Sequence, residues 1–408
     1  MRNYAKHKFA EYYKMCLRGT QIEAPSHLKN REFGFLAFDK TSMFRHKGFE
    51  TEEALNRSLS VVAPSDAYYS SAFYEHPEAD MSKKDWLGAD LVFDIDADHI
   101  PTPCGKIHDS WACNNCNFEG KGPPPERCPK CGKEKFNSKA WMCDTCLEFA
   151  KAETIKLVDM LMQDFGFSES EIKAYFSGNR GYHVHVESKT VLSLDSMARK
   201  EIVDHIIGLG FETEFHKLTE GNRVVARTEM PSWRGRIAKG LHLILSRVTL
   251  EELEAAGLKR GKARYFDDNR KELLSHLSDK GWLGIKEIGS ETWKRIIQLI
   301  VHQQSAKIDT VVTTDVNRLI RLPGSLHGKT GFMKVEVSLS GFEGFDPLKK
   351  GVVFKEGQVV VDIVEAPEFR IGETQYGPFK RALGAELPTA AALFLVCKGV
   401  AQVVNGHV

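Results

Sequence analysis

The chain has 408 residues, of which 42% are hydrophobic and 27% are charged, a globular composition with room for one large domain or two to three smaller ones. Its formal net charge of +1 does not by itself indicate a nucleic-acid partner, so any basic binding surface must be local. No apolar run reaches the ~18 residues of a membrane span, and no apolar signal region follows the N-terminus. We therefore expect a soluble, intracellular (cytoplasmic) protein with no membrane partner.

The first 90 residues predict a helix followed by a strand-rich region. Residues 1–30 have the pattern of one helix and a loop, and residues 31–35 open a strand. Glu32 alternates with apolar neighbours and could face a cleft, and Arg45 follows it. The alternative for both is a solvated surface position. A further strand is expected around residues 67–69.

Residues 91–96 alternate with a period of two, which predicts a strand. Asp94 and Asp96 then leave the same face, about 6–7 Å apart along the strand. Two carboxylates held side by side repel each other unless a cation lies between them, which favours Mg²⁺ or Mn²⁺. Such a pair supports in-line phosphoryl or nucleotidyl transfer with two metals roughly 4 Å apart.

Other interpretations of this acidic strand are an acidic strand end without metal and a sugar-nucleotide transferase site. A calcium loop of the EF-hand type is excluded by its own spacing. His99 stands where the loop needs glycine, and Gly105 stands where it needs a bidentate glutamate.

Seven of the nine cysteines lie between residues 104 and 146, which in an intracellular chain indicates metal binding rather than disulfides. Two Cys-x-x-Cys pairs separated by eleven residues are typical of a zinc ribbon with four thiolates around one ion. Its ligands would be Cys113, Cys116, Cys128 and Cys131. Thiol redox chemistry would need one exposed pair rather than two.

A third pair, Cys143-x-x-Cys146, predicts a second zinc site of three cysteines and one histidine. Its ligands would be Cys104, His108, Cys143 and Cys146. The ribbon would then be an insertion within the loop that this outer site closes. The alternative is one zinc with spare cysteines.

Residues 174–187 predict strand, glycine-containing turn and strand, after an amphipathic helix over residues 147–166. The glycines of the turn allow the backbone to approach a ligand closely. The side chains that could then hold phosphates are Ser177, Arg180 and His183, beside Gly178. The His-x-His pair that begins at His183 could instead bind metal or lie on the surface.

Residues 188–305 are expected to be mainly helical, with helical spacing near 195–208, 249–256, 268–279 and 290–304. A basic loop over residues 223–239 interrupts these helices. It is either part of an ordinary solvated subdomain or a contact for a template.

Residues 306–331 contain a dense set of phosphate-type donors, including Arg318, Arg321 and His327. Residues 308–314 suit a strand, and Asp315 suits the N-cap of a short helix that begins at Val316. The glycine-rich stretch at 324–330 is one residue short of a P-loop and follows a helix, so we reject that motif. Closing strands to about residue 365 and a short apolar helix at 390–397 complete the expected elements.

Four signals occur in order: Phe-Asp-Ile-Asp at 93–96, the cysteine cluster, Ser-Gly-Asn-Arg-Gly-Tyr-His at 177–183, and Asp309 followed by Arg-Leu-Pro-Gly-Ser-Leu-His-Gly-Lys-Thr-Gly at 321–331. This set resembles the catalytic small subunit of archaeal and eukaryotic DNA primases over nearly the whole chain. The resemblance implies an α+β fold in which a mixed β-sheet catalytic (prim) core carries a helical subdomain and an inserted zinc-binding lobe. The expected domains are a discontinuous core (1–103, 147–187 and 306–372), a zinc-binding insertion (104–146), a mainly helical subdomain (188–305) and a C-terminal helical tail (373–408).

The resemblance also implies roles for individual residues. Asp94 and Asp96 would hold two divalent metals with a third carboxylate, which by its position relative to His327 is Asp309 rather than Asp315. The incoming nucleotide would be bound by Ser177, Gly178, Arg180, His183, Arg318, Arg321 and His327, with Glu32 and Arg45 as further contacts. The family usually has one zinc knuckle, which Cys104, His108, Cys143 and Cys146 suit, so the ribbon at 113–131 is additional.

The function implied is DNA-dependent synthesis of short RNA primers on single-stranded DNA for replication, as a nucleotidyltransferase of the primase type. It would use NTPs, or dNTPs as well, with Mg²⁺ or Mn²⁺ at the active site and one or two Zn²⁺ elsewhere. A large regulatory subunit would complete a heterodimer within the primosome and supply much of the template affinity. The alternatives are a primase-polymerase for gap filling or damage bypass, and a non-catalytic zinc-ribbon nucleic-acid adaptor.

Overall fold

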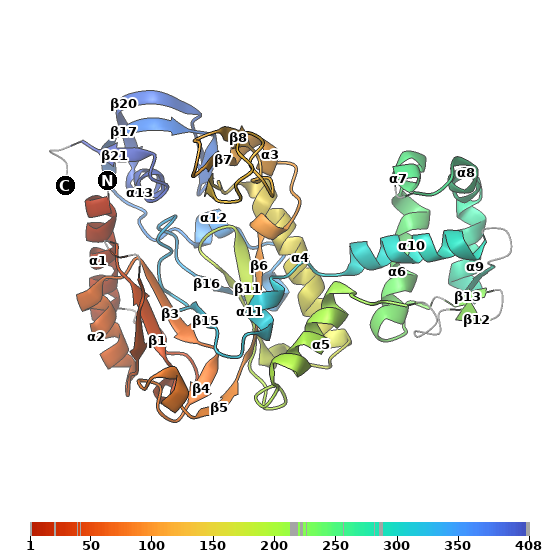
Figure 1. Ribbon diagram of the computed structural model, residues 1–408, viewed down its shortest axis with the longest axis horizontal. Coiled ribbons are helices and arrows are strands. Elements are labelled where there is room, and N and C mark those ends of the chain that lie inside the picture. The colour runs from red at the N-terminus through yellow and green to blue at the C-terminus, as the bar shows by residue number, and fades with distance from the viewer. Residues whose placement is uncertain are drawn as a thin grey trace. The chain divides into compact units, whose positions relative to one another are not determined.

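The computed structural model describes residues 2–19, 22–38, 40, 42–212, 219–220, 223–225, 227–255, 257–280, 282–284 and 289–404. The chain forms two compact units, one of residues 1–154, 169–199 and 308–408 and one of residues 155–168 and 200–307. Helices and sheets are mixed along the chain, and the strand pairings of the described residues are antiparallel (Figure 1). The expected α+β class is confirmed, but the expected mixed sheet is not, because the strand pairings of the described residues are antiparallel. Residues 172–176 and 181–186, for example, are joined by a short turn, a connection that suits only antiparallel strands.

Two four-stranded sheets organise the first unit. The first has the order β15 (Leu319–Arg321), β3 (Asp66–Ser70), β1 (Phe33–Leu36) and β2 (Phe44–Lys47). The second has the order β16 (Val335–Val337), β10 (Ile172–Phe176), β11 (Gly181–Val186) and β6 (Leu91–Asp96). The alternation over 91–96 thus produces the predicted strand, with Phe93 and Ile95 fully buried and Asp94 and Asp96 partly exposed.

A local cap supports helix α2 (Glu52–Val62) of the first unit. The helix begins at Thr51, whose side chain accepts a hydrogen bond from the Ala54 amide, and packs against α1 (Arg2–Arg18). The other helices of this unit are α3 (Gly105–His108), α11 (Thr310–Thr314), α12 (Pro347–Lys350) and α13 (Thr389–Cys397), and α4 (Asp144–Gln163) begins in it.

The prediction for residues 308–316 was wrong in its local structure. Residues 310–314 form helix α11 rather than a strand, and Asp309 rather than Asp315 is the N-cap. The Asp309 carboxylate accepts a hydrogen bond from the Val311 amide at 3.0 Å, while Asp315 ends the helix. The β-branched run favours a strand by propensity alone, but this cap and the tertiary contacts of the segment override that preference.

The C-terminal region carries more strand than the expected helical tail over 373–408. Residues 379–388 form β20, which pairs with β17 (Gln358–Ala366), and β21 (Ala401–Val403) pairs with the other side of β17. Within the part of this tail that the structure describes, residues 373–404, the one helix is α13, and β18 (Phe369–Ile371) pairs with β19 (Thr374–Tyr376). The local sequence of β20 is a weak signal because its hydrogen-bond partners lie on other segments of the chain.

Small sheets fill the remaining segments of the first unit. β4 (Ala72–Tyr74) pairs with β5 (Trp86–Ala89). The cysteine segment contains β7 (Ser110–Cys113), β8 (Glu119–Lys121) and β9 (Phe136–Lys139) in the order β8-β7-β9. Trp111 on the central strand is buried and lies 5.1 Å from the ring of Phe136, which gives this small lobe an aromatic core.

The second unit is mainly helical. Its helices are α6 (Ser232–Arg247), α7 (Leu250–Ala255), α8 (Arg260–Asp268), α9 (Arg270–Lys280) and α10 (Ser290–Gln304), and α5 (Ser196–Ile207) enters it. β12 (Thr219–Glu220), β13 (Arg223–Val225) and β14 (Trp282–Gly284) form a small sheet. No helix in the described part of the chain is long and apolar enough to cross a membrane.

The basic loop expected over residues 223–239 is only partly a loop. Its second half lies in α6, and its first half includes β13, with residue 226 outside the described residues. Arg236 is buried and forms ion pairs of 2.9 Å with Asp159 and Asp164. This arginine therefore stabilises the helical unit instead of presenting its charge to solvent.

Candidate active site and metal centres

Three predicted carboxylates come from two segments that the fold joins. Asp94 and Asp96 lie on β6, at the edge of its sheet. The Asp309 amide donates a hydrogen bond to the Asp94 carbonyl at 2.8 Å, so the start of α11 is fixed beside β6. Asp315 lies at the other end of α11. The structure thus brings together the carboxylates chosen from sequence.

Burial and neighbouring carboxylates raise the pKa of both Asp94 and Asp96. Burial, and then the charges of Asp96 and Asp309, raise the pKa of Asp94 to about 7. Burial and the charge of Asp98 raise the pKa of Asp96. The three carboxylates are not packed into a single-ion shell, because within the described ranges only two cysteine-containing sets have all their ligand atoms within 4.8 Å of one another.

His183 lies directly opposite Asp94 in the β11–β6 register, and Gly181 lies opposite Asp96. The His183 Nε2 is 3.6 Å from the Asp94 Oδ1. Burial and the neighbouring Lys334 lower the pKa of His183, which keeps the imidazole neutral. A side chain at Gly181 would place its Cβ 1.9 Å from the Ile95 carbonyl oxygen, so the close approach of the turn to β6 requires glycine.

The turn at Ser177 and the loop at His327 pack against each other. Gly178 has φ of +84°, and a Cβ there would lie 3.0 Å from the His327 Cβ. The Thr330 hydroxyl donates to the Gly178 carbonyl at 2.5 Å. Two motifs separated by about 150 residues in the chain therefore form one wall.

Arg180, Arg318 and Arg321 differ in their partners. Arg321 is buried and forms a 2.7 Å ion pair with Asp66. Arg180 is fully buried and forms ion pairs with Asp98 and Asp109. Arg318 is partly exposed, and its charge reaches Asp94, whose pKa it lowers in opposition to the larger raising effects. Of these three arginines, Arg318 is the most open to a ligand.

Glu32 and Arg45 are joined to each other. The Glu32 carboxylate is buried and receives the Arg45 guanidinium at 3.0 and 3.2 Å, with the Lys84 ammonium at 3.4 Å. The Arg45 side chain is partly exposed. Glu32 thus positions Arg45, and Arg45 is the member of the pair that can reach a ligand.

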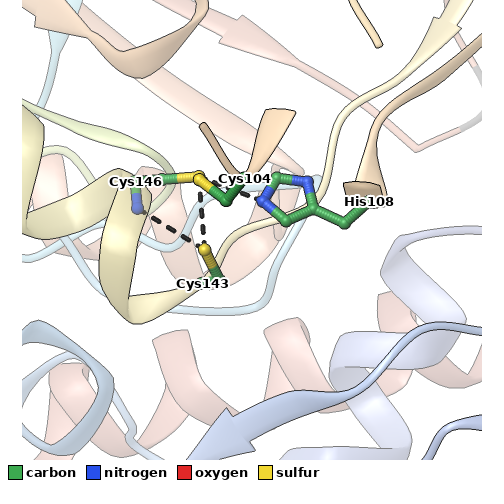
Figure 2. Close-up of side chains that lie close together, drawn as sticks. All are labelled: Cys104, His108, Cys143 and Cys146. Carbon is green, nitrogen blue, oxygen red and sulfur yellow. Dashed lines mark hydrogen bonds between the residues drawn. The ribbon is translucent and has the colours of Figure 1, made fainter. Parts of the chain in front are cut away.

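Cys104, His108, Cys143 and Cys146, called the Cys/His set below, suit a tetrahedral zinc ion (Figure 2). The thiol of Cys146 lies 3.3 Å from that of Cys104, 3.5 Å from that of Cys143, and 3.2 Å from His108 Nε2. Sulfur atoms around one zinc lie about 3.8 Å apart, since each Zn–S bond is about 2.3 Å. The donor types and their convergence therefore fit this ion.

The four ribbon cysteines, Cys113, Cys116, Cys128 and Cys131, converge on one another and not on the Cys/His set, so the two proposed zinc sites share no ligand. The Cys113 and Cys131 sulfurs are 3.5 Å apart, and the Cys116 and Cys128 sulfurs are 3.6 Å apart. All nine cysteines are free of disulfides. The division into two sets of four is thus the one that the sequence predicted.

Sequence reasoning missed three charged residues in this region. Asp66 pairs with Arg321, Asp109 contacts His108, and the Lys334 ammonium is buried 3.3 Å from His185 Nε2. Asp109 had a usable signal, because it directly follows a proposed histidine ligand and such ligands commonly donate their second ring N–H to a carboxylate. Asp66 and Lys334 lie in no motif.

Comparison with known proteins decides the family. Residues 125–339, more than half of the chain, match the family described as DNA primase small subunit. The chain belongs to the DNA primase small subunit family. It is 36% identical to the DNA primase small subunit PriS of Methanococcoides burtonii, with 98% of this chain and 97% of that protein covered. It is 34% identical to the protein of that name from Methanothrix thermoacetophila, with 98% of each chain covered.

The similarity to this primase family extends beyond the matched segment. The protein of the same name from Methanosarcina barkeri is 32% identical, with 99% of this chain and 96% of that protein covered. The matched segment contains Ser177, His183, Asp309 and His327, whereas Asp94 and Asp96 precede it. The family assignment therefore rests on the whole chain and not on one motif.

Proposed function

We propose that this chain is the catalytic subunit of a primase that makes short RNA primers on single-stranded DNA for replication. The observation that carries the proposal is the meeting of Asp94, Asp96 and Asp309 beside the Ser177–His327 wall, in a chain of the primase small-subunit family. Carboxylates next to phosphate-binding groups are the elements that two-metal nucleotidyl transfer requires.

In this proposal Asp94, Asp96 and Asp309 hold two Mg²⁺ or Mn²⁺ ions. The ions, when bound, lower the pKa of the primer 3′-hydroxyl and offset charge on the pyrophosphate leaving group. Asp309 keeps its place because it caps α11 and is bonded to β6. The raised pKa of Asp94 means that metal binding displaces a proton from the site near neutral pH.

The triphosphate is proposed to lie along the wall formed by Ser177, Gly178, His183 and His327, with Arg318 and Arg45 open to it. Neutral histidines can donate hydrogen bonds to phosphate oxygens without a large desolvation cost. Arg180 and Arg321 are buried in ion pairs with carboxylates, which fix the orientation of both side chains and offset their positive charge.

The domain assignment and the partners are also part of the proposal. We assign residues 1–103, 147–187 and 306–372 to a prim catalytic core, 104–146 to a zinc-binding lobe with two Zn²⁺ sites, and 188–305 to the helical subdomain. The relatives are named as small subunits, which supports a large regulatory partner that supplies template affinity. The net charge of +1 is consistent with weak template binding by this chain alone.

The test is incorporation of labelled NTPs on unprimed single-stranded DNA, with Mg²⁺ or Mn²⁺, with and without a candidate large subunit. We would compare Asp309→Asn with Asp315→Asn, because both residues lie at ends of α11 and both side chains accept a backbone hydrogen bond that asparagine can also accept. Asp309→Asn is expected to lower synthesis by at least about 100-fold, and Asp315→Asn by less than about threefold.

Equal loss in the two variants would refute the choice of Asp309. No synthesis by the wild type under any condition would favour the zinc-ribbon adaptor. Efficient extension of gapped DNA with dNTPs, without synthesis on unprimed template, would favour the gap-filling primase-polymerase.

A further inference from the structure

A run of short polar contacts connects the Cys/His set to the carboxylate strand. Asp109 directly follows the proposed ligand His108, and its Oδ1 is 2.7 Å from His108 Nδ1. The same oxygen accepts the Trp141 amide at 2.9 Å, and the Asp109 Oδ2 accepts Arg180 Nη1 at 2.9 Å. Asp109 is therefore held by contacts to its neighbour His108 and to two other segments of the chain.

Arg180 carries these contacts to the active-site strand. Its Nη1 is also 2.9 Å from Asp98 Oδ1, and its carbonyl accepts the Ala97 amide at 3.2 Å. Asp98 in turn donates its amide to Asp96 Oδ1 at 2.9 Å. A continuous series of contacts thus connects the Cys/His set to the proposed catalytic carboxylate of Asp96. In order, it passes through His108, Asp109, Arg180, Asp98 and Asp96.

Burial strengthens the contact between Arg180 and Asp109, whereas the side chain of Asp98 is 51% exposed. The Arg180 side chain is 1% exposed and that of Asp109 is 13% exposed. A guanidinium buried to this extent needs a carboxylate partner, because an unpaired buried charge is strongly destabilising. In addition, a carboxylate on the non-ligating nitrogen of a metal-bound histidine fixes the orientation of the ring and raises its basicity as a ligand.

We infer that Asp109 is a positioning residue that couples metal binding at Cys104, His108, Cys143 and Cys146 to the geometry of the catalytic carboxylate Asp96. The inference rests on the proposed function for the role of Asp96, but the coupling itself concerns metal binding at two places. When the site that contains His108 holds its metal, His108 holds Asp109 in place. Asp109 in turn holds Arg180 against Asp98. When that metal leaves, Asp109 is held less firmly, and Arg180 loses one of the two carboxylates that fix its guanidinium.

The test measures two kinds of metal binding separately. Purified protein carrying both zinc equivalents is titrated with Mn²⁺ and followed by electron paramagnetic resonance, which reports on the oxygen-ligand site because Cys-rich sites disfavour Mn²⁺. Zinc release to a chelator is followed on the same samples. The variants are Asp109→Asn and, as an exposed acidic control in the same lobe, Glu119→Gln.

For Asp109→Asn we expect about 10- to 100-fold weaker retention of one zinc equivalent, the usual effect of losing such a partner. We also expect about 2- to 30-fold weaker Mn²⁺ binding on zinc-loaded protein, the range of coupling between connected sites. Glu119→Gln should change neither quantity. Normal Mn²⁺ affinity in zinc-loaded Asp109→Asn would overturn the inference, and so would an equal effect in Glu119→Gln.

A second variant keeps the test decisive if Asp109→Asn does not fold. Arg180→Lys retains the positive charge, but its side chain is one atom too short to reach the position of Nη1, the nitrogen that contacts both carboxylates. We expect weaker Mn²⁺ binding with both zinc equivalents still present, and unchanged Mn²⁺ binding would overturn the inference. Because neither readout uses primer synthesis, failure of the proposed function would appear as an inactive wild type whose two metal sites are still coupled.

Discussion

Replacement of Asp94 by asparagine should stabilise the metal-free protein while it abolishes primer synthesis. Asparagine has the same shape as a protonated aspartate but carries no charge. The pKa of Asp94 is raised to about 7 in the folded protein by burial and by Asp96 and Asp309, against about 4 in an unfolded chain. The folded state therefore binds the proton more tightly than the unfolded state does.

The sign and size of the effect follow from linkage. A raised carboxyl pKa contributes stability that is fully present below about pH 4 and is lost as pH rises through about 7. Three pKa units correspond to about 4 kcal/mol at most, and about 2 kcal/mol is a better expectation because the side chain is 28% exposed. Asp94→Asn should thus raise the melting temperature at pH 8 by on the order of 3 °C and have little effect at pH 4.5.

The assay is a pair of thermal melts of wild type and Asp94→Asn in a chelator that leaves the zinc sites occupied, at pH 4.5 and pH 8. Saturating Mg²⁺ should reverse the order at pH 8, since only the wild type gains stability from the bound ion. A difference between the two proteins that does not change with pH would refute the reasoning, because the repulsion would then not be present in the folded state.

Other substitutions test the packing around the site. Asp66→Asn leaves the buried Arg321 without its 2.7 Å partner and should destabilise the first unit by about 3–5 kcal/mol in chemical denaturation; a loss under about 1 kcal/mol would show that the pair is solvated. Gly181→Ala should displace β6 and weaken Mn²⁺ binding at least about tenfold, because its Cβ would lie 1.9 Å from the Ile95 oxygen. Gly261→Ala is the matched control, because Gly261 lies in α8 and its added Cβ would meet no atom of another segment within 4 Å. This variant should bind Mn²⁺ normally and slightly stabilise the helical unit against unfolding. Equal Mn²⁺ affinity in these two glycine variants would contradict the steric argument.

Much of the candidate site was predictable because its signals are local. The period of two over residues 91–96 places Asp94 and Asp96 on one face of a strand whatever that strand packs against. The spacing of Cys-x-x-Cys pairs likewise brings two thiolates together within a single turn, so both sets of four were identified from sequence.

Other features depended on partners that lie far away in the chain. Residues 310–314 have the composition of a strand but form a helix, because Asp309 caps it and is bonded to Asp94. Residues 379–388 were expected in a helical tail but form β20, because β17 supplies the hydrogen bonds. Local propensity is worth only tenths of a kcal/mol to about 1 kcal/mol per residue, and tertiary contacts exceed it.

The sequence by itself determined where the candidate ligand residues lie: the carboxylates of the 91–96 strand, the two sets of cysteine and histidine residues, and the order in which these motifs occur. Only the tertiary structure decided which charges face each other. It placed His183 opposite Asp94, paired Arg321 with Asp66, and joined Arg180 to Asp98 and Asp109. The physical reason is that side-chain periodicity is a property of a few consecutive residues, whereas a buried ion pair depends on the register and packing of segments that the sequence keeps far apart.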